Sequence, residues 1–321
     1  MNAKIIGTGC QLPAYAADNH YLSTLVETSD EWITERTGIR MRHLAQKETT
    51  TSLSVDAAGK ALASAGMQAS DIDLLIVATI TADTETPSTA CRVQAEIGAV
   101  NAVAFDINAA CSGFLYALHI ADAFIKSGVY KNALLIGAET LSKLVDWTDR
   151  GTCVLFGDGA GAVVLTASKQ GGVLSQSVGS NGSKWEVLSC AARPVRNPVC
   201  QSKEVPGYLR MDGQEVFKFA VKTVPLCIED ALEKAGLQPE EITHYLLHQA
   251  NKRIIQTVAK RLKQPEERFP MNIDQCANTS AASLPILLAQ MDTQGRLHPG
   301  DKLVLSGFGA GLTWGACVLE W

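Results

Sequence analysis

The residues AGMQASDIDLLIVAT at positions 65–79 align without a gap with AGLQPEEITHYLLHQ at positions 235–249, an offset of 170 residues. Four positions are identical, and most of the others keep their chemical character. Further pairs at the same offset are NAACSGFL from Asn108 with NTSAASLP from Asn278, and KNALLIGAE from Lys131 with DKLVLSGFG from Asp301. The sequence therefore predicts a duplicated chain.

Each predicted half, 1–170 and 171–321, repeats one order of elements. An alanine-rich helix, at 54–65 and again at 224–235, ends at a glycine. A buried strand, a turn of small residues that opens another helix, and two further strands follow. Alternating strands and helices are typical of α/β proteins, and duplication favours two packed sheets related by a pseudo-twofold axis. Because no low-complexity linker separates the halves, we expect them to be fused, with equivalent loops meeting at the junction.

The composition limits the class of protein. With 321 residues, of which 46% are hydrophobic, the chain can bury a large core. No apolar run approaches the roughly 20 residues of a membrane-spanning helix, and the N-terminus lacks the layout of a signal peptide, so we expect a cytoplasmic protein that does not enter a membrane. Nine cysteines without a Cys-x-x-Cys pair fit reduced thiols. A net charge of −5 argues against general nucleic-acid binding.

Cys111 stands in INAACSGFLYAL, after the apolar run AVAFDI and before an amphipathic pattern that ends at Gly128. This places the cysteine at a helix N-terminus, where unpaired N–H groups and the helix dipole favour the nucleophilic thiolate. An isolated cysteine is more often a small buried apolar residue. The second half has Ala281 at the equivalent position, so the duplicated fold does not itself require sulfur there.

The matching asymmetry lies in the second half. His248 occupies the position equivalent to Ala78, at the end of a predicted strand, and Asn278 opens the turn equivalent to that of Cys111. A histidine at a strand end, taken alone, is more often structural. A pseudo-twofold arrangement would bring these loop ends to Cys111, and a cysteine, a histidine and an asparagine together indicate nucleophilic catalysis.

Several motifs, which together span essentially the whole chain, resemble those of one family. They are TSDEWITERTGIR from Thr28, DINAACSGF from Asp106, DRGTCVLFGDGAGAVVL from Asp149, HQANKRI from His248, ANTSAAS from Ala277 and FGAGLTWGA from Phe308. In this order they resemble the β-ketoacyl-acyl carrier protein synthase III enzymes of the thiolase superfamily. The resemblance implies a thiolase-like α/β fold, with two duplicated halves packed as five layers (αβαβα) with mixed sheets.

The resemblance also implies a reaction. Cys111 attacks the thioester of an acyl-CoA primer and holds the acyl group, malonyl-acyl carrier protein loses carbon dioxide, and the resulting carbanion attacks the acyl-cysteine. His248 and Asn278 then serve as neutral hydrogen-bond donors to the thioester oxygen, where charge develops. The backbone N–H groups of Cys111 and Ala310 form the oxyanion hole. Many members carry glycine at the position of Ala310, so an unusual dihedral angle there would be strained.

The stretch TSDEWITERTG predicts a helix with a capping box from Thr28 to Glu31 and a stop at Gly38. Trp32 and Arg36 then share a face of the helix, where an indole and a guanidinium can hold a flat base between them. The sequence fits equally well with a structural role, in which Trp32 covers the edge of the core. By resemblance, the adenine contacts of CoA are Trp32, Arg36 and Arg150, and the residues along the pantetheine path are Asn251 and Gly213. No step needs a metal or redox cofactor.

The segment 242–265 contains no Asp or Glu but five basic residues. They are Lys252, Arg253, Lys260, Arg261 and Lys263. Such a run is usually a solvated helix face, but beside His248 it could steer an acidic carrier protein. By resemblance, Arg253, with its neighbour Lys252, is the carrier-protein contact.

Two glycine-rich stretches invite a nucleotide-binding interpretation. GDGAGA from Gly157 satisfies the G-x-G-x-x-G/A pattern, but a β-prone segment follows it where a dinucleotide fold needs a helix. GFGAGLTWGACVL also runs into a predicted strand. We therefore interpret both as tight hairpin-like turns rather than a Rossmann site.

The primer pocket is where the chain departs from acetyl-selective members of the family. Those place a bulky Phe before the Pro-Ser of this motif, and the ring closes the acyl pocket across the dimer interface. This chain has Thr86 in ETPSTACRVQ. Threonine at this position predicts a longer pocket, unless another side chain fills the vacated space.

These observations predict a homodimeric enzyme that initiates fatty-acid synthesis by decarboxylative condensation. A synthase III-like acyltransferase of secondary metabolism is the alternative enzyme, and it would share Cys111, His248 and Asn278. A noncatalytic acyl-CoA or carrier-protein binding module is the alternative of another class, and the intact set of three argues against it.

Overall fold

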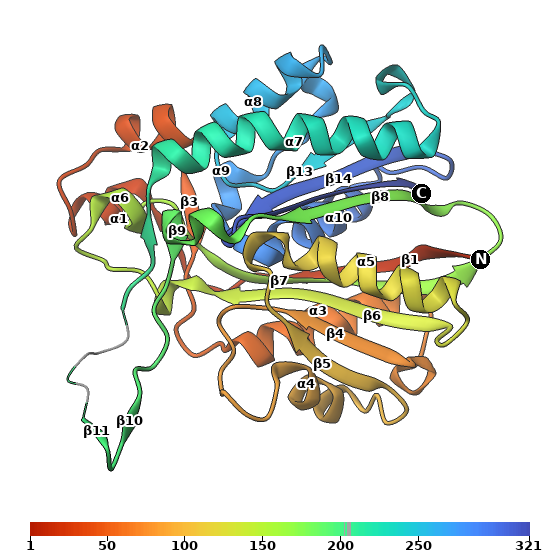
Figure 1. The fold of residues 1–321 in the computed structure, drawn as a ribbon, viewed down its shortest axis with the longest axis horizontal. Helices are drawn as coiled ribbons and strands as arrows, with labels where there is room; N and C mark the ends of the chain where they lie inside the picture. Colours follow the sequence, from red (N-terminus) through yellow and green to blue (C-terminus); the bar gives the residue numbers. More distant parts are fainter. Residues whose placement is uncertain (202, 204–206) are drawn as a thin grey trace.

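In a computed structural model, which describes residues 1–201, 203 and 207–321, the chain forms alternating layers of helix, sheet, helix, sheet and helix (Figure 1). The two outer helical layers cover the outer face of each sheet, and the inner helical layer lies between the sheets. The predicted αβαβα architecture with mixed sheets is confirmed. No helix of the described residues is long and apolar enough to span a membrane.

The first sheet contains the N-terminal half of the chain. Its strand order is β1 (Asn2–Gln11), β7 (Asp158–Ser168), β6 (Asn132–Thr140), β4 (Leu74–Ala78) and β5 (Val103–Ile107). β4 runs parallel to β5 and β6, whereas β7 runs antiparallel to β1 and β6. Every residue of β4 is buried, because helices cover the sheet on both faces and both faces of the strand must therefore be apolar.

The second sheet contains the C-terminal half. Its strand order is β13 (His244–Leu247), β14 (Lys302–Gly309), β15 (Thr313–Glu320) and β8 (Gly172–Ser180). β13 and β14 are parallel, and the other neighbours are antiparallel. The chain changes sheet between Ser168 and Gly172, which supports the predicted division into 1–170 and 171–321; the division itself remains a prediction.

Three pairs of helices make the helical layers. The outer pairs are α3 (Thr50–Ala65) with α4 (Thr89–Ile97), and α7 (Gly213–Ala235) with α8 (Lys252–Arg261); the inner pair is α5 (Gly113–Lys126) with α10 (Ser283–Thr293). The inner helices contribute residues such as Phe114, Leu118 and Leu288 to one buried cluster that joins the two sheets. A helix buried between sheets is apolar on most of its surface, as the sequences of α5 and α10 are.

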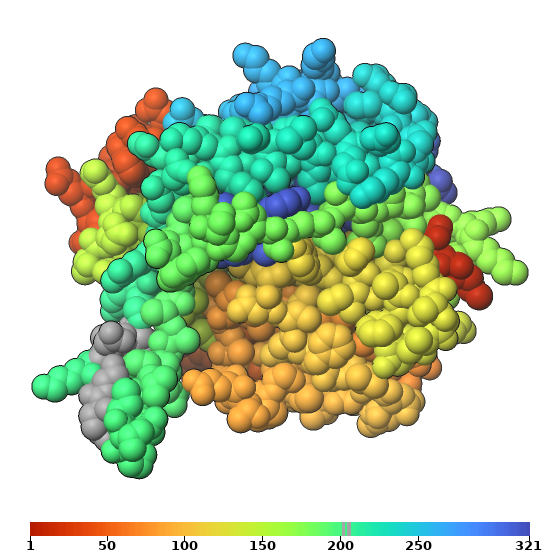
Figure 2. All heavy atoms as spheres, in the orientation of Figure 1, coloured from red at the N-terminus to blue at the C-terminus, as the bar shows by residue number. Residues whose placement is uncertain are grey.

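The remaining elements flank these layers. They are α1 (Asn19–Ser23), α2 (Asp30–Thr37), α6 (Arg150–Cys153), α9 (Ile273–Cys276), the strand pairs β2 (Ala16–Asp18) with β3 (Met41–His43), β9 (Leu188–Ser189) with β12 (Arg210–Met211), and β10 (Arg196–Asn197) with β11 (Cys200–Gln201), and the 3-10 helices η1 (Ala69–Asp71), η2 (Ala110–Ser112), η3 (Leu141–Lys143), η4 (Gly182–Val187), η5 (Pro239–Glu241), η6 (Glu266–Arg268) and η7 (Ser280–Ala282). The β10–β11 hairpin projects from the layered body (Figure 2).

The predicted repeat is confirmed, but one element differs between the halves and two helices begin earlier than predicted. β4, η2 with α5, β6 and β7 of the first half match β13, η7 with α10, β14 and β15 of the second. The strand β5 has the short helix α9 at its equivalent position. The helices predicted at 54–65 and 224–235 begin earlier, at Thr50 and Gly213, because Thr49 and Asp212 cap them.

The interpretation of GDGAGA as a hairpin-like turn is wrong. From Asp158 this segment is the first part of the long strand β7. A Cβ added to Gly161 would lie 2.5 Å from the backbone nitrogen of Ile286, so this glycine lets α10 approach the sheet closely. The second glycine-rich stretch does form the turn of a hairpin, between β14 and β15.

Candidate active site

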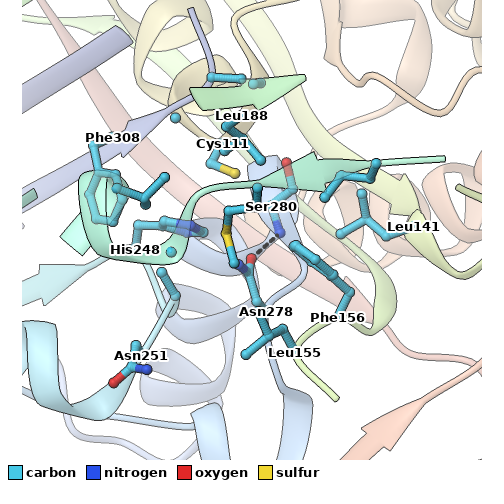
Figure 3. A pocket seen from close by; sticks show the side chains of 18 of the residues that line it. Cys111, Leu141, Leu155, Phe156, Leu188, His248, Asn251, Asn278, Ser280 and Phe308 are labelled. Atoms are coloured by element: carbon cyan, nitrogen blue, oxygen red, sulfur yellow. Dashed lines mark hydrogen bonds between the residues drawn. The ribbon is translucent and has the colours of Figure 1, made fainter. Parts of the chain in front are cut away.

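A cavity of about 880 Å³ lies where the two halves meet, and Cys111, His248 and Asn278 all line it. Their side chains converge on the same space although they come from η2, from the end of β13 and from the turn before η7 (Figure 3). The structure therefore brings together the three residues that the sequence selected as catalytic.

Cys111 lies in η2, directly before α5, and only 9% of the residue is exposed. Burial raises the pKa of its thiol to about 12, although the neighbouring Ser280 hydroxyl acts in the opposite direction. The expectation that the helix end favours a thiolate is thus not confirmed for the free enzyme, because the loss of solvation outweighs it. Attack by Cys111 needs a group that removes its proton.

His248 is held at both its backbone and its ring. Its backbone N–H donates to the carbonyl oxygen of Ser306 at 2.8 Å, and its Nδ1 lies 2.6 Å from the hydroxyl oxygen of Ser283. Ser283 Oγ also accepts a long hydrogen bond of 3.5 Å from the backbone N–H of Gln249, and its own hydrogen can be donated to Nδ1. In the tautomer that accepts it, the cavity receives Nε2–H, a donor.

Burial also fixes the charge of His248. The residue is 3% exposed, and desolvation lowers the pKa of its imidazole to about 3. The ring is therefore neutral throughout the physiological pH range, as a neutral hydrogen-bond donor must be. Sequence reasoning missed Ser283, although one signal existed: the equivalent position in the first half is Gly113, which cannot hold a ring.

The side-chain amide of Asn278 is oriented by its own turn. Its Oδ1 accepts a hydrogen bond of 2.9 Å from the backbone N–H of Ser280, so its NH₂ group is left to donate elsewhere. The backbone of Asn278 is fixed by hydrogen bonds of 3.0 Å to Leu155 and Gly157. His248 and Asn278 thus each present one oriented donor, with the acceptor side of each group already occupied.

Ala310 lines the cavity in the turn between β14 and β15. Its φ angle is not positive, so the strain considered for an alanine at this position does not occur. The glycine that matters is Gly309, where an added Cβ would lie 2.6 Å from the backbone nitrogen of Cys111. A glycine at 309 therefore keeps the Cys111 N–H accessible.

Three of the five residues expected to contact CoA line the cavity. Arg36, Gly213 and Asn251 line it, and Asn251 Nδ2 donates to the carbonyl oxygen of Arg36 at 3.0 Å. The guanidinium carbons of Arg36 and Arg150 lie 4.9 and 4.8 Å from the ring centre of Trp32. Trp32 and Arg150 are not part of the lining but connect to it through Arg36.

The predicted capping box of the helix that carries Trp32 is wrong, and a single N-cap stands one residue later. α2 begins at Asp30, and its N-cap is Ser29, whose hydroxyl accepts a hydrogen bond of 3.2 Å from the backbone N–H of Trp32. Thr28 is therefore not the cap. The predicted stop is confirmed, because Gly38 ends the helix with a φ of 85°.

The start of the basic segment lies at the cavity, whereas Thr86, the expected acyl-pocket residue, does not. Arg253 lines the cavity at the start of α8, and Lys252 is exposed beside Gly38. Thr86 is exposed on the loop before α4 and does not line the cavity within one chain.

Sequence reasoning missed the apolar lining, which includes Ile80, Leu141, Leu144, Leu155, Phe156, Leu188 and Leu209.

The family models of 3-oxoacyl-[acyl-carrier-protein] synthase III match this chain at residues 105–182, and those of its C-terminal part match residues 232–321. The beta-ketoacyl-[acyl-carrier-protein] synthase III of Clostridium perfringens (strain SM101 / Type A) is 50% identical over 321 residues, which cover 99% of each chain. The chain belongs to the β-ketoacyl-acyl carrier protein synthase III family. The chain is therefore a condensing acyltransferase, and the resemblance of the motifs is confirmed.

Solved structures agree with this assignment. The chain is similar to the crystal structure of 3-oxoacyl-[acyl-carrier-protein] synthase III from Aquifex aeolicus VF5, with a TM-score of 0.93 and 48% identity over 99% of this chain and all of the other. It is also similar to the priming beta-ketosynthase from the R1128 polyketide biosynthetic pathway, with a TM-score of 0.93 and 34% identity over 99% and 96% of the two chains. The thiolase-like fold is thus shared by relatives named for two kinds of pathway.

Proposed function

We propose that the chain condenses an acyl-CoA primer with malonyl-acyl carrier protein through Cys111, His248 and Asn278, and so initiates fatty-acid synthesis. Cys111 Sγ attacks the primer thioester, CoA leaves, and an acyl-cysteine remains. Malonyl-acyl carrier protein then loses carbon dioxide, and its carbanion attacks the acyl-cysteine to give 3-oxoacyl-acyl carrier protein. No step uses a metal or redox cofactor.

The observation that carries this proposal is the charge and the hydrogen bonding of His248 and Asn278. Decarboxylation places negative charge on the malonyl thioester oxygen, and donors fixed in advance stabilise such charge in a buried site. His248 is neutral and has Nδ1 occupied by Ser283, while Asn278 has its Oδ1 occupied by Ser280. Both groups can donate at once, and neither can act as a strong base.

The oxyanion hole is proposed to consist of the backbone N–H groups of Cys111 and Ala310. Gly309 supports this assignment, since its missing Cβ leaves the Cys111 nitrogen uncovered. Trp32, Arg36 and Arg150 are proposed to hold the adenine of CoA, with Gly213 and Asn251 along the pantetheine arm. Adenine would take a place beside the indole, where the guanidinium groups now lie.

The test of the proposed function is direct. The full chain is mixed with acyl-CoA primers and malonyl-acyl carrier protein, and carbon dioxide release and the product are measured by mass spectrometry. Release of carbon dioxide with formation of 3-oxoacyl-acyl carrier protein supports the proposal. Acyl transfer to another acceptor without carbon dioxide release would contradict it and favour an acyltransferase of secondary metabolism.

Replacing Arg253 by glutamate is expected to raise the KM for malonyl-acyl carrier protein roughly tenfold at low salt. The carrier protein is acidic, and Arg253 lies at the cavity in a segment without carboxylates. Acylation of Cys111 by acyl-CoA should change little, and the effect should shrink as salt is added. Steady-state kinetics at several salt concentrations measure this.

The matched control for Arg253→Glu is Arg261→Glu, an equal charge change at the opposite end of the same helix, away from the cavity lining. A smaller rise in KM is expected for the control. If the KM for malonyl-acyl carrier protein is unchanged in the Arg253 variant, the basic segment is only a solvated helix face.

Medium-chain or branched acyl-CoAs are expected to acylate Cys111 at least as well as acetyl-CoA, because Thr86 replaces a pocket-closing ring. Four additional methylenes that find apolar surface would favour hexanoyl over acetyl on the order of 100-fold. The many leucine side chains of the lining can supply that surface. The relative rates of acylation are measured by mass spectrometry with competing primers.

Thr86→Phe should selectively remove the longer primers, whereas Thr86→Val, which keeps the side-chain size, should not. Thr86 lies outside the cavity of its own chain, so this prediction requires a second copy to present the residue. Refusal of primers of six carbons or more by the wild type would show that another side chain closes the pocket.

A homodimer and a reducing compartment complete the proposal. β5 is the outermost strand of its sheet, and Val103 at its start is 51% exposed, so this edge can pair with the same strand of a second copy. The nine cysteines, all within the described residues, are free thiols, as expected in the cytoplasm. Analytical ultracentrifugation measures the first of these proposals.

A further inference from the structure

A buried carboxyl group that takes no part in the steps described above holds a segment of the cavity wall. Glu139 lies one residue before the end of β6 and is 0% exposed. Its oxygens accept hydrogen bonds from the Thr81 hydroxyl at 2.5 Å, from the Ile80 backbone N–H at 3.1 and 3.3 Å, and from the Thr79 hydroxyl at 3.3 Å. A buried carboxyl group is costly unless donors surround it, so Glu139 and these three consecutive residues fix one another.

Ile80 is the member of this segment that reaches the cavity. It packs against the buried cluster that contains Leu141 and Phe156, and all three residues line the cavity. Leu141 and Phe156 lie on the same side of the cavity in Figure 3. Glu139 is therefore bonded to a part of the apolar surface that a bound acyl chain would meet.

The hydrogen bond from Ile80 to Glu139 begins where the bonding within the sheet ends. The backbone N–H of Thr79 donates to the carbonyl oxygen of Ile107, the last residue of β5, at 3.2 Å. The next N–H along the chain, that of Ile80, donates to the Glu139 carboxyl instead. A side-chain carboxyl thus takes the place of a strand carbonyl in fixing the backbone of Ile80.

The duplicated fold does not itself require this carboxyl group. At the offset of 170 residues, the position equivalent to Glu139 is Gly309, which has no side chain, and the position equivalent to Ile80 is Ala250. Ala250 lines the cavity too. The first half therefore combines a larger apolar residue at the cavity with a dedicated acceptor for its backbone, and the second half has neither.

Resting on the proposed function, we propose that Glu139 is a positioning residue for primer selection, which acts by holding Ile80 in the wall that a bound acyl chain contacts. An acetyl group on Cys111 is too short to use much of this wall, whereas a hexanoyl chain must pack on it. A wall that is fixed in advance spares the longer primer the cost of ordering it. No bond to Glu139 forms or breaks during acylation.

Glu139→Gln tests the proposal with little change in the shape of the side chain. The two carboxyl oxygens lie 3.3 and 3.1 Å from the Ile80 nitrogen, so either orientation of the new amide turns an NH₂ group toward that N–H. Two donors that face each other make no hydrogen bond. The variant therefore keeps the volume of the side chain and weakens its hold on Ile80.

The experiment acylates the full chain with acetyl-CoA and hexanoyl-CoA in competition and measures both adducts by mass spectrometry. We expect Glu139→Gln to lower the hexanoyl-to-acetyl ratio about 10-fold, while the rate with acetyl-CoA alone changes less than about twofold. Because the ratio is taken within one sample, a loss of folded protein does not affect it.

Thr81 supplies a second pair of variants that leaves Glu139 in place. Thr81→Val keeps the size of the side chain but removes the hydroxyl that donates to Glu139, so the hexanoyl-to-acetyl ratio should fall. Thr81→Ser keeps the hydroxyl, and the ratio should remain close to that of the wild type. If Glu139→Gln does not fold, this pair decides, and equal ratios in the two Thr81 variants would overturn the proposal.

A double variant shows whether Glu139 acts through Ile80. Ile80→Ala alone should lower the hexanoyl-to-acetyl ratio, and adding Glu139→Gln should then change the ratio less than about twofold. Asp122→Asn is the matched control and should keep the wild-type ratio. Asp122 is also a buried carboxyl group, but it accepts hydrogen bonds from the Ala3 backbone N–H and the Gln176 amide, away from the cavity lining.

The hexanoyl-to-acetyl ratios can contradict the proposal in several ways. An unchanged or higher ratio in Glu139→Gln would overturn it, as would an equal fall in Asp122→Asn. A fall of the same size in the wild-type and Ile80→Ala backgrounds would show that Glu139 acts elsewhere. Refusal of hexanoyl-CoA by a wild type that accepts acetyl-CoA would also overturn it, because no longer chain would then pack on this wall. A wild type that forms no adduct with either primer would instead contradict the proposed function.

Discussion

Cys111→Ala should form no acyl adduct with any acyl-CoA, and its condensing activity should fall by at least about three orders of magnitude. The reason is that Cys111 is the proposed nucleophile, and alanine offers no atom to which the acyl group can be bonded. Cys111→Ser should also fail in normal condensation, because a hydroxyl is a much weaker nucleophile than a thiolate. Intact-protein mass spectrometry after mixing with acyl-CoA detects the adduct.

Cys190 supplies the matched control for this prediction. It also lines the cavity, and its thiol donates to the Gly207 carbonyl oxygen at 3.3 Å. Cys190→Ala should therefore still be acylated. Loss of the adduct in the Cys190 variant, with retention in the Cys111 variant, would move the nucleophile to the other cysteine and contradict the mechanism.

His248→Ala and Asn278→Ala are each expected to slow malonyl decarboxylation by about 10²–10³-fold while changing acylation of Cys111 only a few-fold. Each substitution removes one oriented donor to the malonyl oxygen. Decarboxylation is measured as carbon dioxide release from malonyl-acyl carrier protein, and acylation as the mass of the adduct. An equal fall of both half-reactions would show that the donors do not act specifically on malonyl.

Two further measurements separate the donor role of His248 from a structural one. Ser283→Ala leaves the imidazole in place but removes the partner that fixes its tautomer, so decarboxylation should fall less than in His248→Ala. Because the pKa of His248 is lowered to about 3, the ring gains its proton only well below pH 5. Decarboxylation by Cys111→Ala, in which thiol ionisation plays no part, should therefore show no inflection from His248 between pH 5 and 8.

Much of the fold follows from local pattern. The aligned segments at 65–79 and 235–249 each place a buried strand after a glycine that ends a helix, and the structure confirms both. Where local pattern misled, a contact distant in the sequence decided the outcome. GDGAGA looks like a turn, but its pairing with β1 and β6 makes it part of a strand.

The sequence by itself determined the duplication and the three residues of the candidate site. Cys111 and His248 each have an alanine at the equivalent position of the other half, and Asn278 opens the turn equivalent to that of Cys111. Strand ends and helix starts are set by residues nearby. The tertiary structure alone decided how these groups are charged and oriented. Burial between two sheets raises the pKa of Cys111 and lowers that of His248, and the partner of His248, Ser283, comes from another element. Desolvation and hydrogen bonding depend on everything that surrounds a group, so no local stretch of sequence contains them.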